Sequence, residues 1–232
     1  MGNHDLDFGE GVLAKFIQRL PTTSFVLSNV DALSTKAPLA NCMSSTILLA
    51  GDVKVGLIGL LEEEVLATIP SMPPHLFSEP CTVASRLAAK LREDGAEVVV
   101  VLAHARRVNL QRYGEIDGVD FVFGGHEHEL MLERKLIVSG SDFRHVGVVD
   151  LVVERGRVAV ASARHVPVSR DLAPSISMQR VVESVIAQVN AKLSKTLGWS
   201  ANAIDVLETS CRAGESNFGS FIADLCRTTL GF

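Results

Sequence analysis

The chain has 232 residues, of which 47% are hydrophobic and 21% are charged, and this balance is enough to bury a substantial core. The formal net charge of −5 excludes a strongly basic surface, so we expect no nucleic-acid partner. No apolar run approaches the roughly 18 residues of a membrane span, and the first residues do not resemble a signal peptide. The cytoplasm is therefore the default expectation, with no membrane partner, and the oligomeric state stays open.

The first hundred residues alternate between predicted helices and strands. Apolar residues recur at helical spacing over residues 10–20, and "SFVLSN" then predicts a short buried strand. The segment "TILLAGDVKVGLIGL" predicts two strands joined by a turn at Gly51-Asp52. Val83, Leu87 and Leu91 predict one face of a helix that ends near Gly95.

The second half continues this alternation. "AEVVVVLAH" and "VDFVFGGHEH" begin with continuous apolar runs, which are typical of buried parallel strands. "KLIVSG", "VGVVDLVVE" and "RVAVASARHVPV" predict further strands, and an apolar stripe predicts a long helix over residues 177–197. The predicted fold class is therefore α/β with a mixed sheet.

Three loops carry side chains that suit a metal ion. Asn3-His4-Asp5 opens the chain, His104 follows one predicted strand, and His126-Glu127-His128 follows another. Each motif alone is compatible with an ordinary turn or a solvated loop. Together they predict a site, because the carboxyl ends of parallel strands meet at one sheet edge and imidazole and amide donors suit Mn²⁺, Zn²⁺ or Fe. Two such ions can hold a phosphate for in-line attack, which indicates ester hydrolysis.

These segments resemble a known family. "GNHDLDFG", the histidine of "VVVLAH", and "GVDFVFGGHEH" resemble the calcineurin-like metallophosphoesterases, and more narrowly the 5'-nucleotidase family among them. "IVSGSDFRHVGVVDL" is similar to an intervening segment, and "CRAGESNFGSFIADLCR" is similar to the start of the family's carboxyl-terminal domain. The resemblance implies an αββα sandwich with mixed sheets over residues 1–170, a linker helix over 171–198, and the beginning of a second domain over 199–232.

The resemblance also implies roles for individual residues. Asn3, His104 and His126 would bind one divalent ion and His128 a second, the ions being Mn, Zn or Fe, with Mg also compatible. His4 would be the catalytic histidine that Asp7 holds, and a metal-bound hydroxide would hydrolyse phosphate monoesters, nucleoside 5'-monophosphates or related nucleotides. Arg106 is either a weak substrate-binding residue or an exposed loop charge, and the sequence leaves both open.

One part of the family pattern is missing. The family carries an Asp-x-His pair and a Gly-Asp pair ahead of the catalytic loop, whereas Gly51-Asp52 here follows that loop. We therefore expect a chain without the family's first strands, with half of a dinuclear site, and weak or inactive on its own. The alternative is an inactive, degenerate member that acts as a metal-binding or assembly module.

Overall fold

A computed structural model describes residues 1–154, 156–169 and 171–231. The chain divides into two compact units, Met1–Leu172 and Ala173–Phe232, and each is described by itself. Residue 170, where the sequence predicts the end of the first domain, lies outside the described residues. The identities assigned to the domains from the resemblance stay predictions.

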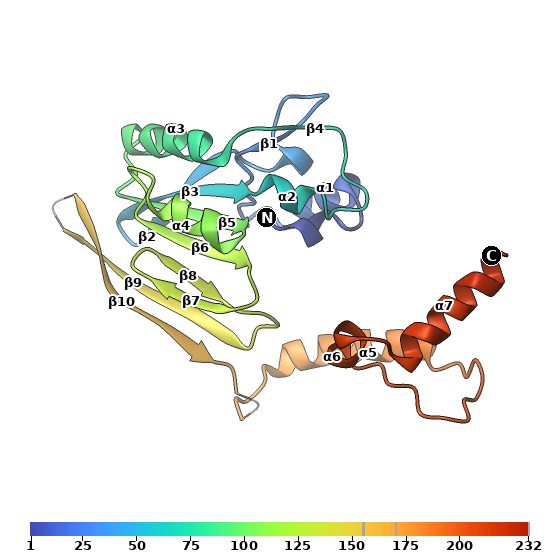
Figure 1. The fold of residues 1–232 in the computed structure, drawn as a ribbon. Coiled ribbons are helices and arrows are strands. Elements are labelled where there is room, and N and C mark those ends of the chain that lie inside the picture. Colours follow the sequence, from blue (N-terminus) through green and yellow to red (C-terminus); the bar gives the residue numbers. More distant parts are fainter. Residues whose placement is uncertain (155, 170, 232) are drawn as a thin grey trace. The chain divides into compact units, whose positions relative to one another are not determined.

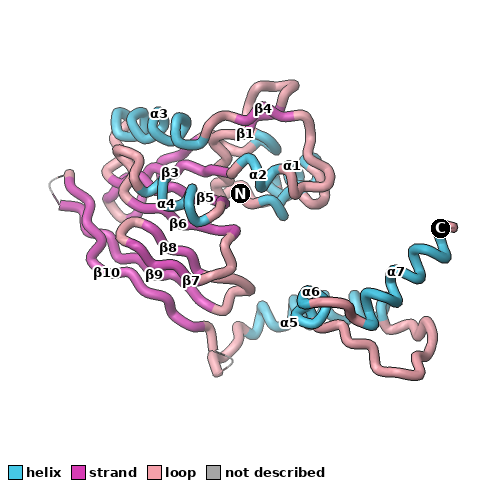
Figure 2. Tube along the Cα trace, in the orientation of Figure 1, coloured by secondary structure: helices cyan, strands magenta, loops and turns pink. Residues whose placement is uncertain are grey.

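A mixed sheet forms the centre of the first unit (Figures 1 and 2). Within the described residues it has six strands in the order β2-β3-β5-β6-β8-β7, in which β3, β5, β6 and β8 are parallel and the two edge strands run antiparallel. The strands are β2 (Ser45–Ala50), β3 (Val53–Leu61), β5 (Val98–Ala105), β6 (Phe121–His126), β7 (Leu130–Glu133) and β8 (Leu136–Ser139).

Shorter elements surround this sheet. Two antiparallel pairs are β1 (Val30–Ala32) with β4 (His75–Phe77), and β9 (His145–Glu154) with β10 (Arg157–Pro167). The helices are η1 (Asn3–Leu6), α1 (Glu10–Gln18), η2 (Leu39–Asn41), α2 (Glu63–Leu66), α3 (Pro80–Glu93) and α4 (Arg107–Gly114). The predicted α/β class with a mixed sheet is confirmed.

Most of the predicted elements are present, and their local chemistry explains them. The Gly51-Asp52 turn joins β2 to β3, and Gly51 has φ +61, which favours glycine. Helix α3 begins where the Glu79 carboxylate accepts hydrogen bonds from two backbone amides of the first turn, with Pro80 as its first residue. It ends just before Gly95, at φ +94.

The prediction of a regular strand at "SFVLSN" is wrong. Within this segment the structure has one isolated bridge, between Val26 and Met43. A few backbone bonds hold the segment, among them Leu27 N–H to the Met43 carbonyl and Ser28 N–H to the Gly59 carbonyl, and side chains add to them. Asn29 Oδ1 accepts from the Leu61 amide, and Asn29 Nδ2 donates to the Leu61 carbonyl. The Gly59 amide donates to Ser28 Oγ in the same way. Val26 and Leu27 are buried as the prediction requires, but the backbone bonds form no continuous ladder, and the side chains of Ser28 and Asn29 make the remaining contacts with β3.

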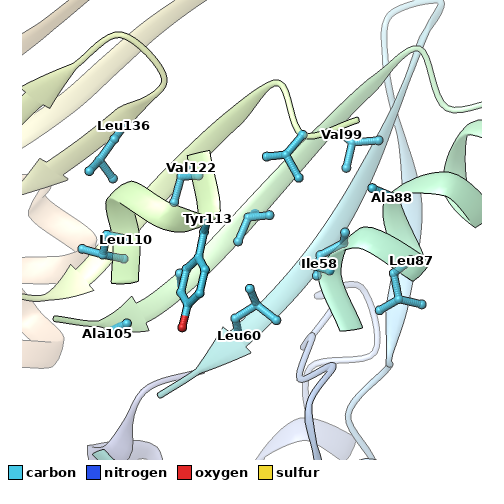
Figure 3. Packing of buried hydrophobic residues seen from close by; sticks show 14 of the residues in the cluster. Ile58, Leu60, Leu87, Ala88, Val99, Ala105, Leu110, Tyr113, Val122 and Leu136 are labelled. Carbon is cyan, nitrogen blue, oxygen red and sulfur yellow. The ribbon is translucent and has the colours of Figure 1, made fainter. Parts of the chain in front are cut away.

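The main core lies between the sheet and the two helices α3 and α4 (Figure 3). Tyr113 and Leu110 of α4 meet Val122 of β6, while Leu87 of α3 faces Ile58 of β3, and all five are at most 3% exposed. Side chains of this size each stabilise the fold by about 1.5–3 kcal/mol when fully buried. This packing fixes the carboxyl ends of β5 and β6, from which the candidate site is built.

The second unit contains α5 (Ile176–Leu193), α6 (Glu208–Ala213) and α7 (Asn217–Leu230). Helix α5 matches the long helix predicted from the apolar stripe, and Ser175 caps it by accepting a hydrogen bond from the Met178 amide. Its apolar residues are exposed in the described structure. In the described part of the chain, no helix combines the length and the hydropathy of a membrane span.

Candidate metal centre

The site lies at the carboxyl edge of the parallel strands. His104 is near the end of β5 and His126 is the last residue of β6, and the register pairs His104 with Gly125 and Ala105 with His126. Asn3 reaches the same place from the short helix η1. Three side chains that are distant in sequence therefore meet because two neighbouring strands end together and the opening helix lies against them.

Distances define the centre of the site. Asn3 Oδ1 lies 2.9 Å from His104 Nε2, and the rings of His104 and His126 have centroids 5.2 Å apart in an edge-to-face arrangement. Glycines give His104 the room it needs, because a Cβ on Gly2 or on Gly125 would lie 3.0 Å from His104 Nδ1. The glycines of the two motifs therefore have a packing reason that the sequence pattern alone did not provide.

A cavity of about 470 Å³ opens at this edge. Its lining contains the four residues predicted to bind metal, the predicted catalytic His4, and four residues for which no role was predicted. The lining residues are Asn3, His4, His104, His126, Glu127, His128, Gly140, Ser141 and Asp142. His126 has φ +82, a conformation that non-glycine residues adopt rarely and mainly where function or packing imposes it. His128 lines the cavity as an exposed residue.

Sequence reasoning did not select the carboxylates of this cavity. Glu127 stands between the two histidines, where its side chain accepts a hydrogen bond from the Arg107 amide at 2.8 Å. Asp142 comes from the loop after β8, whose backbone has positive φ at Gly140 and at Asp142. The turn residues of "SGSDF" were the available signal for a tight loop, but they do not show which sheet edge the loop approaches.

His4 is hydrogen-bonded to Asp7 within the opening loop. Its Nδ1 lies 2.8 Å from Asp7 Oδ2, and the two side chains are 83% and 39% exposed. Asp5 accepts a hydrogen bond from the Gly2 amide at 2.7 Å and so closes the loop on itself. The opening loop thus keeps its histidine oriented while leaving the imidazole accessible to a ligand.

Arg106 is paired with a carboxylate, whereas a phosphate-binding role requires its guanidinium to be available to the substrate. Its guanidinium forms an ion pair with Glu64, and both side chains are about 60% exposed. Its backbone amide donates to the buried carboxylate of Glu62, which also accepts from Asn109. Glu62, which sequence reasoning missed, therefore ties the end of β3 to the turn that follows His104.

The electrostatics of His104 suit a ligand. The pKa of His104 is lowered to about 4, mainly by burial and to a smaller extent by the neighbouring His126 and the chain's amino group. The imidazole is therefore neutral at physiological pH. A neutral ring keeps a lone pair that can bind a cation.

The donor set fits one divalent ion better than two. Asn3, His104 and His126 supply an amide oxygen and imidazole nitrogens that converge on one place, a combination that first-row metals accept. No group of three His, Cys, Asp or Glu side chains among the described residues is arranged to hold a metal. A second ion would therefore find fewer than three such ligands among the described residues, and His128 is the one that the resemblance assigns to it.

Comparison with known proteins finds relatives at low sequence identity. No protein-family model matches the chain. A 5'-nucleotidase of Bos taurus is 22% identical over 256 residues, which cover 97% of this chain and 44% of the relative. The chain thus spans less than half the length of this relative, and the match extends over both of its compact units.

Solved structures show the same fold. The structure of a 5'-nucleotidase precursor from Thermus thermophilus superimposes with a TM-score of 0.71 at 22% identity, over 84% of this chain and 43% of that one. The calcineurin-like phosphoesterase YfkN from Bacillus subtilis superimposes with a TM-score of 0.66 at 18% identity, over 84% and 70% of the two chains. At these identities the likeness establishes the fold.

Proposed function

We propose that this chain is a 5'-nucleotidase-like metallophosphoesterase and that it hydrolyses phosphate monoesters of nucleosides. The observation that carries the proposal is the convergence of Asn3, His104 and His126 in one cavity whose lining includes His4, which is hydrogen-bonded to Asp7. The relatives named 5'-nucleotidase support a nucleotide substrate, and the phosphoesterase fold supports the reaction class.

The chain's own residues divide the work in this proposal. Asn3, His104 and His126 hold a divalent ion, with Mn²⁺, Zn²⁺ or Fe as the preferred metals and Mg²⁺ as a further possibility, and His128 contributes to a second. A bound ion supplies positive charge to the phosphate oxygens and makes a water molecule more acidic. The neutral state of His104 keeps its nitrogen available for this binding.

His4 acts on the substrate in this proposal. Asp7 accepts a hydrogen bond from the His4 ring and so fixes the orientation of the imidazole. When the ring carries a second proton, the opposite nitrogen can donate that proton or a hydrogen bond to the leaving oxygen of the ester. An oriented donor of this kind contributes about 100-fold or more to the rate.

A second candidate function is metal binding without catalysis. It is favoured by one observation, namely that the described residues offer three neutral donors for one ion and no group of three His, Cys, Asp or Glu for another. Since no carboxylate among these donors offsets the charge of the cation, we expect weak binding and slow turnover by residues 1–232 on their own.

Phosphate release from AMP and from p-nitrophenyl phosphate tests the proposal. Residues 1–232 are assayed with Mn²⁺ or Zn²⁺ and after chelation, beside His126→Ala and, as a matched control, His75→Ala, whose ring bonds the Pro73 carbonyl outside the cavity. We expect slow, metal-dependent release that His126→Ala abolishes and His75→Ala keeps. Release that survives chelation would contradict the proposal, and metal binding without any release would favour the second candidate.

A further inference from the structure

The amide of Asn3 has partners at both ends. Its Nδ2 donates to Thr68 Oγ1 at 2.9 Å, and its Oδ1 lies 2.9 Å from His104 Nε2. Asn3 is 8% exposed, so neither end is freely hydrated. The oxygen and the NH₂ group of an amide have nearly the same shape, and only their hydrogen-bond partners decide which of them faces the cavity.

The hydrogen bonds of Thr68 decide which way the Asn3 amide is turned. Its hydroxyl donates to the Val65 carbonyl at 2.7 Å, which uses its one proton. The hydroxyl oxygen can then only accept, so the NH₂ end of Asn3 must face Thr68 and the carbonyl end must face His104. The acceptor is itself held in place, because Val65 belongs to α2 and is 2% exposed.

We propose that Thr68 is a positioning residue for the metal centre, which it serves by turning the Asn3 carbonyl oxygen toward the bound cation. The inference rests on the proposed function, since it needs a cation beside Asn3 and His104. With the amide reversed, the NH₂ group would point its partial positive charge at the cation and would offer no lone pair. Thr68 reaches Asn3 from 65 positions away in the chain, so no local motif announces this role.

Binding of Mn²⁺, measured as the loss of the EPR signal of the free ion, tests the role without using activity. Thr68→Val removes the hydroxyl but keeps the shape, and Thr68→Ser restores the hydroxyl. Thr46→Val is the matched control, a half-buried threonine in β2 outside the cavity lining. We expect Thr68→Val to weaken Mn²⁺ binding by about 10- to 100-fold, as other outer residues of metal sites do, with Thr68→Ser and Thr46→Val within about threefold of the parent.

Asn3→Ala and NMR separate failure of the inference from failure of the proposed function. If Asn3→Ala weakens Mn²⁺ binding and Thr68→Val does not, the metal centre stands and the role of Thr68 is wrong. If the parent binds no Mn²⁺, or if Asn3→Ala binds Mn²⁺ as tightly as the parent, Asn3 is not a ligand. The proposed centre is then wrong, and the inference falls with it. In the metal-free chain, the Asn3 NH₂ protons should exchange faster in Thr68→Val than in the parent and in Thr68→Ser, and equal exchange in all three would overturn the inference.

Discussion

Two pairs of histidines in the described structure meet edge to face, and they lie in different settings. His104 and His126 end neighbouring parallel strands, with ring centroids 5.2 Å apart. His145 and His165 lie on the antiparallel β9–β10 hairpin with centroids 6.5 Å apart, on one face, because His165 is opposite Gly147. A contact between two imidazoles is therefore common to both places and does not by itself identify a metal site.

The surroundings separate the two pairs. The ring of His165 bonds the Val138 carbonyl through Nε2, so backbone already uses that nitrogen. His104 instead faces the Asn3 amide oxygen beside a cavity of about 470 Å³ that also contains His126 and His128. Three or more converging donors make a metal site. The proposed metal centre therefore rests on the surroundings of His104 and His126 at the strand ends, and not on a pair of histidines alone.

The largest expected effect tests directly whether the two histidine pairs differ in metal binding. Because His126 is a proposed ligand, His126→Ala should weaken Mn²⁺ binding by more than about 100-fold, above the cost of removing an outer residue. His165→Ala should leave the binding within about twofold, since that residue is outside the proposed donor set. Titration calorimetry at pH 7 measures both, and equal losses in the two variants would show that the pairs are not different in kind.

The next effect separates metal binding from turnover at the proposed metal centre. His4→Ala should lower phosphate release from AMP by about 100-fold, because it removes the proposed donor to the leaving oxygen. Binding of Mn²⁺ should be unchanged, since His4 is not a proposed ligand. AMP with a radiolabelled phosphate gives the sensitivity that slow turnover needs. Asp7→Asn should lower phosphate release by less than His4→Ala does. Parental turnover in His4→Ala would remove the assigned role.

A smaller effect appears in the pH dependence of stability without metal. The pKa of His104 is about 4 in the folded chain, mainly because of burial, and lies below that of an unfolded histidine near 6.5. Between these values the unfolded chain binds the extra proton, so stability falls as the pH drops from about 6.5 to about 4 and His104 causes no further loss below that. Because His104 is only partly buried, we expect about 1–2 kcal/mol.

Urea unfolding in EDTA across this pH range measures the effect. His104→Gln should flatten the fall in the free energy of unfolding, because the substituted amide does not titrate. An equally steep fall in His104→Gln and in the parent would show that other groups cause the pH dependence and that burial of this ring has little weight.

The smallest expected effect concerns Arg106, which must leave Glu64 to reach a substrate phosphate. Because exposed ion pairs of this kind contribute only about 0–1 kcal/mol, the change of partner is inexpensive. We expect Arg106→Gln to raise the KM for AMP about threefold, which is under 1 kcal/mol, and to leave kcat unchanged. Steady-state kinetics with Glu64→Gln as the companion variant measures it, and an unchanged KM would leave Arg106 as a loop charge.

Sequence patterns predicted the parts of the site that local periodicity controls. The runs before His104 and His126 are continuous and apolar, so their assignment to buried parallel strands placed both histidines at one edge. Asn3 was expected at that edge as a residue that follows a strand, but it reaches the edge from η1. The placement of the two histidines needed only the direction and the ends of strands, which the apolar runs provide.

Other features depend on contacts between distant segments and were not predictable in this way. Asn29 pairs with β3 through its side chain, so a buried run that looked like a strand is not one. Thr68 and Glu62 act on residues 65 and 44 positions away, and no spacing rule connects them. The positive φ of His126 is likewise not announced by the residue type, because non-glycine residues adopt this conformation rarely.

The central claim is a metal centre at Asn3, His104 and His126, and anomalous diffraction tests it most directly. Crystals of residues 1–232 grown with Zn²⁺ and measured at the zinc absorption edge should show a peak about 2.0–2.2 Å from Asn3 Oδ1 and from a ring nitrogen of each histidine. Data from His126→Ala crystals should lack that peak. A peak at His145 and His165 instead, or none near Asn3, would contradict the account.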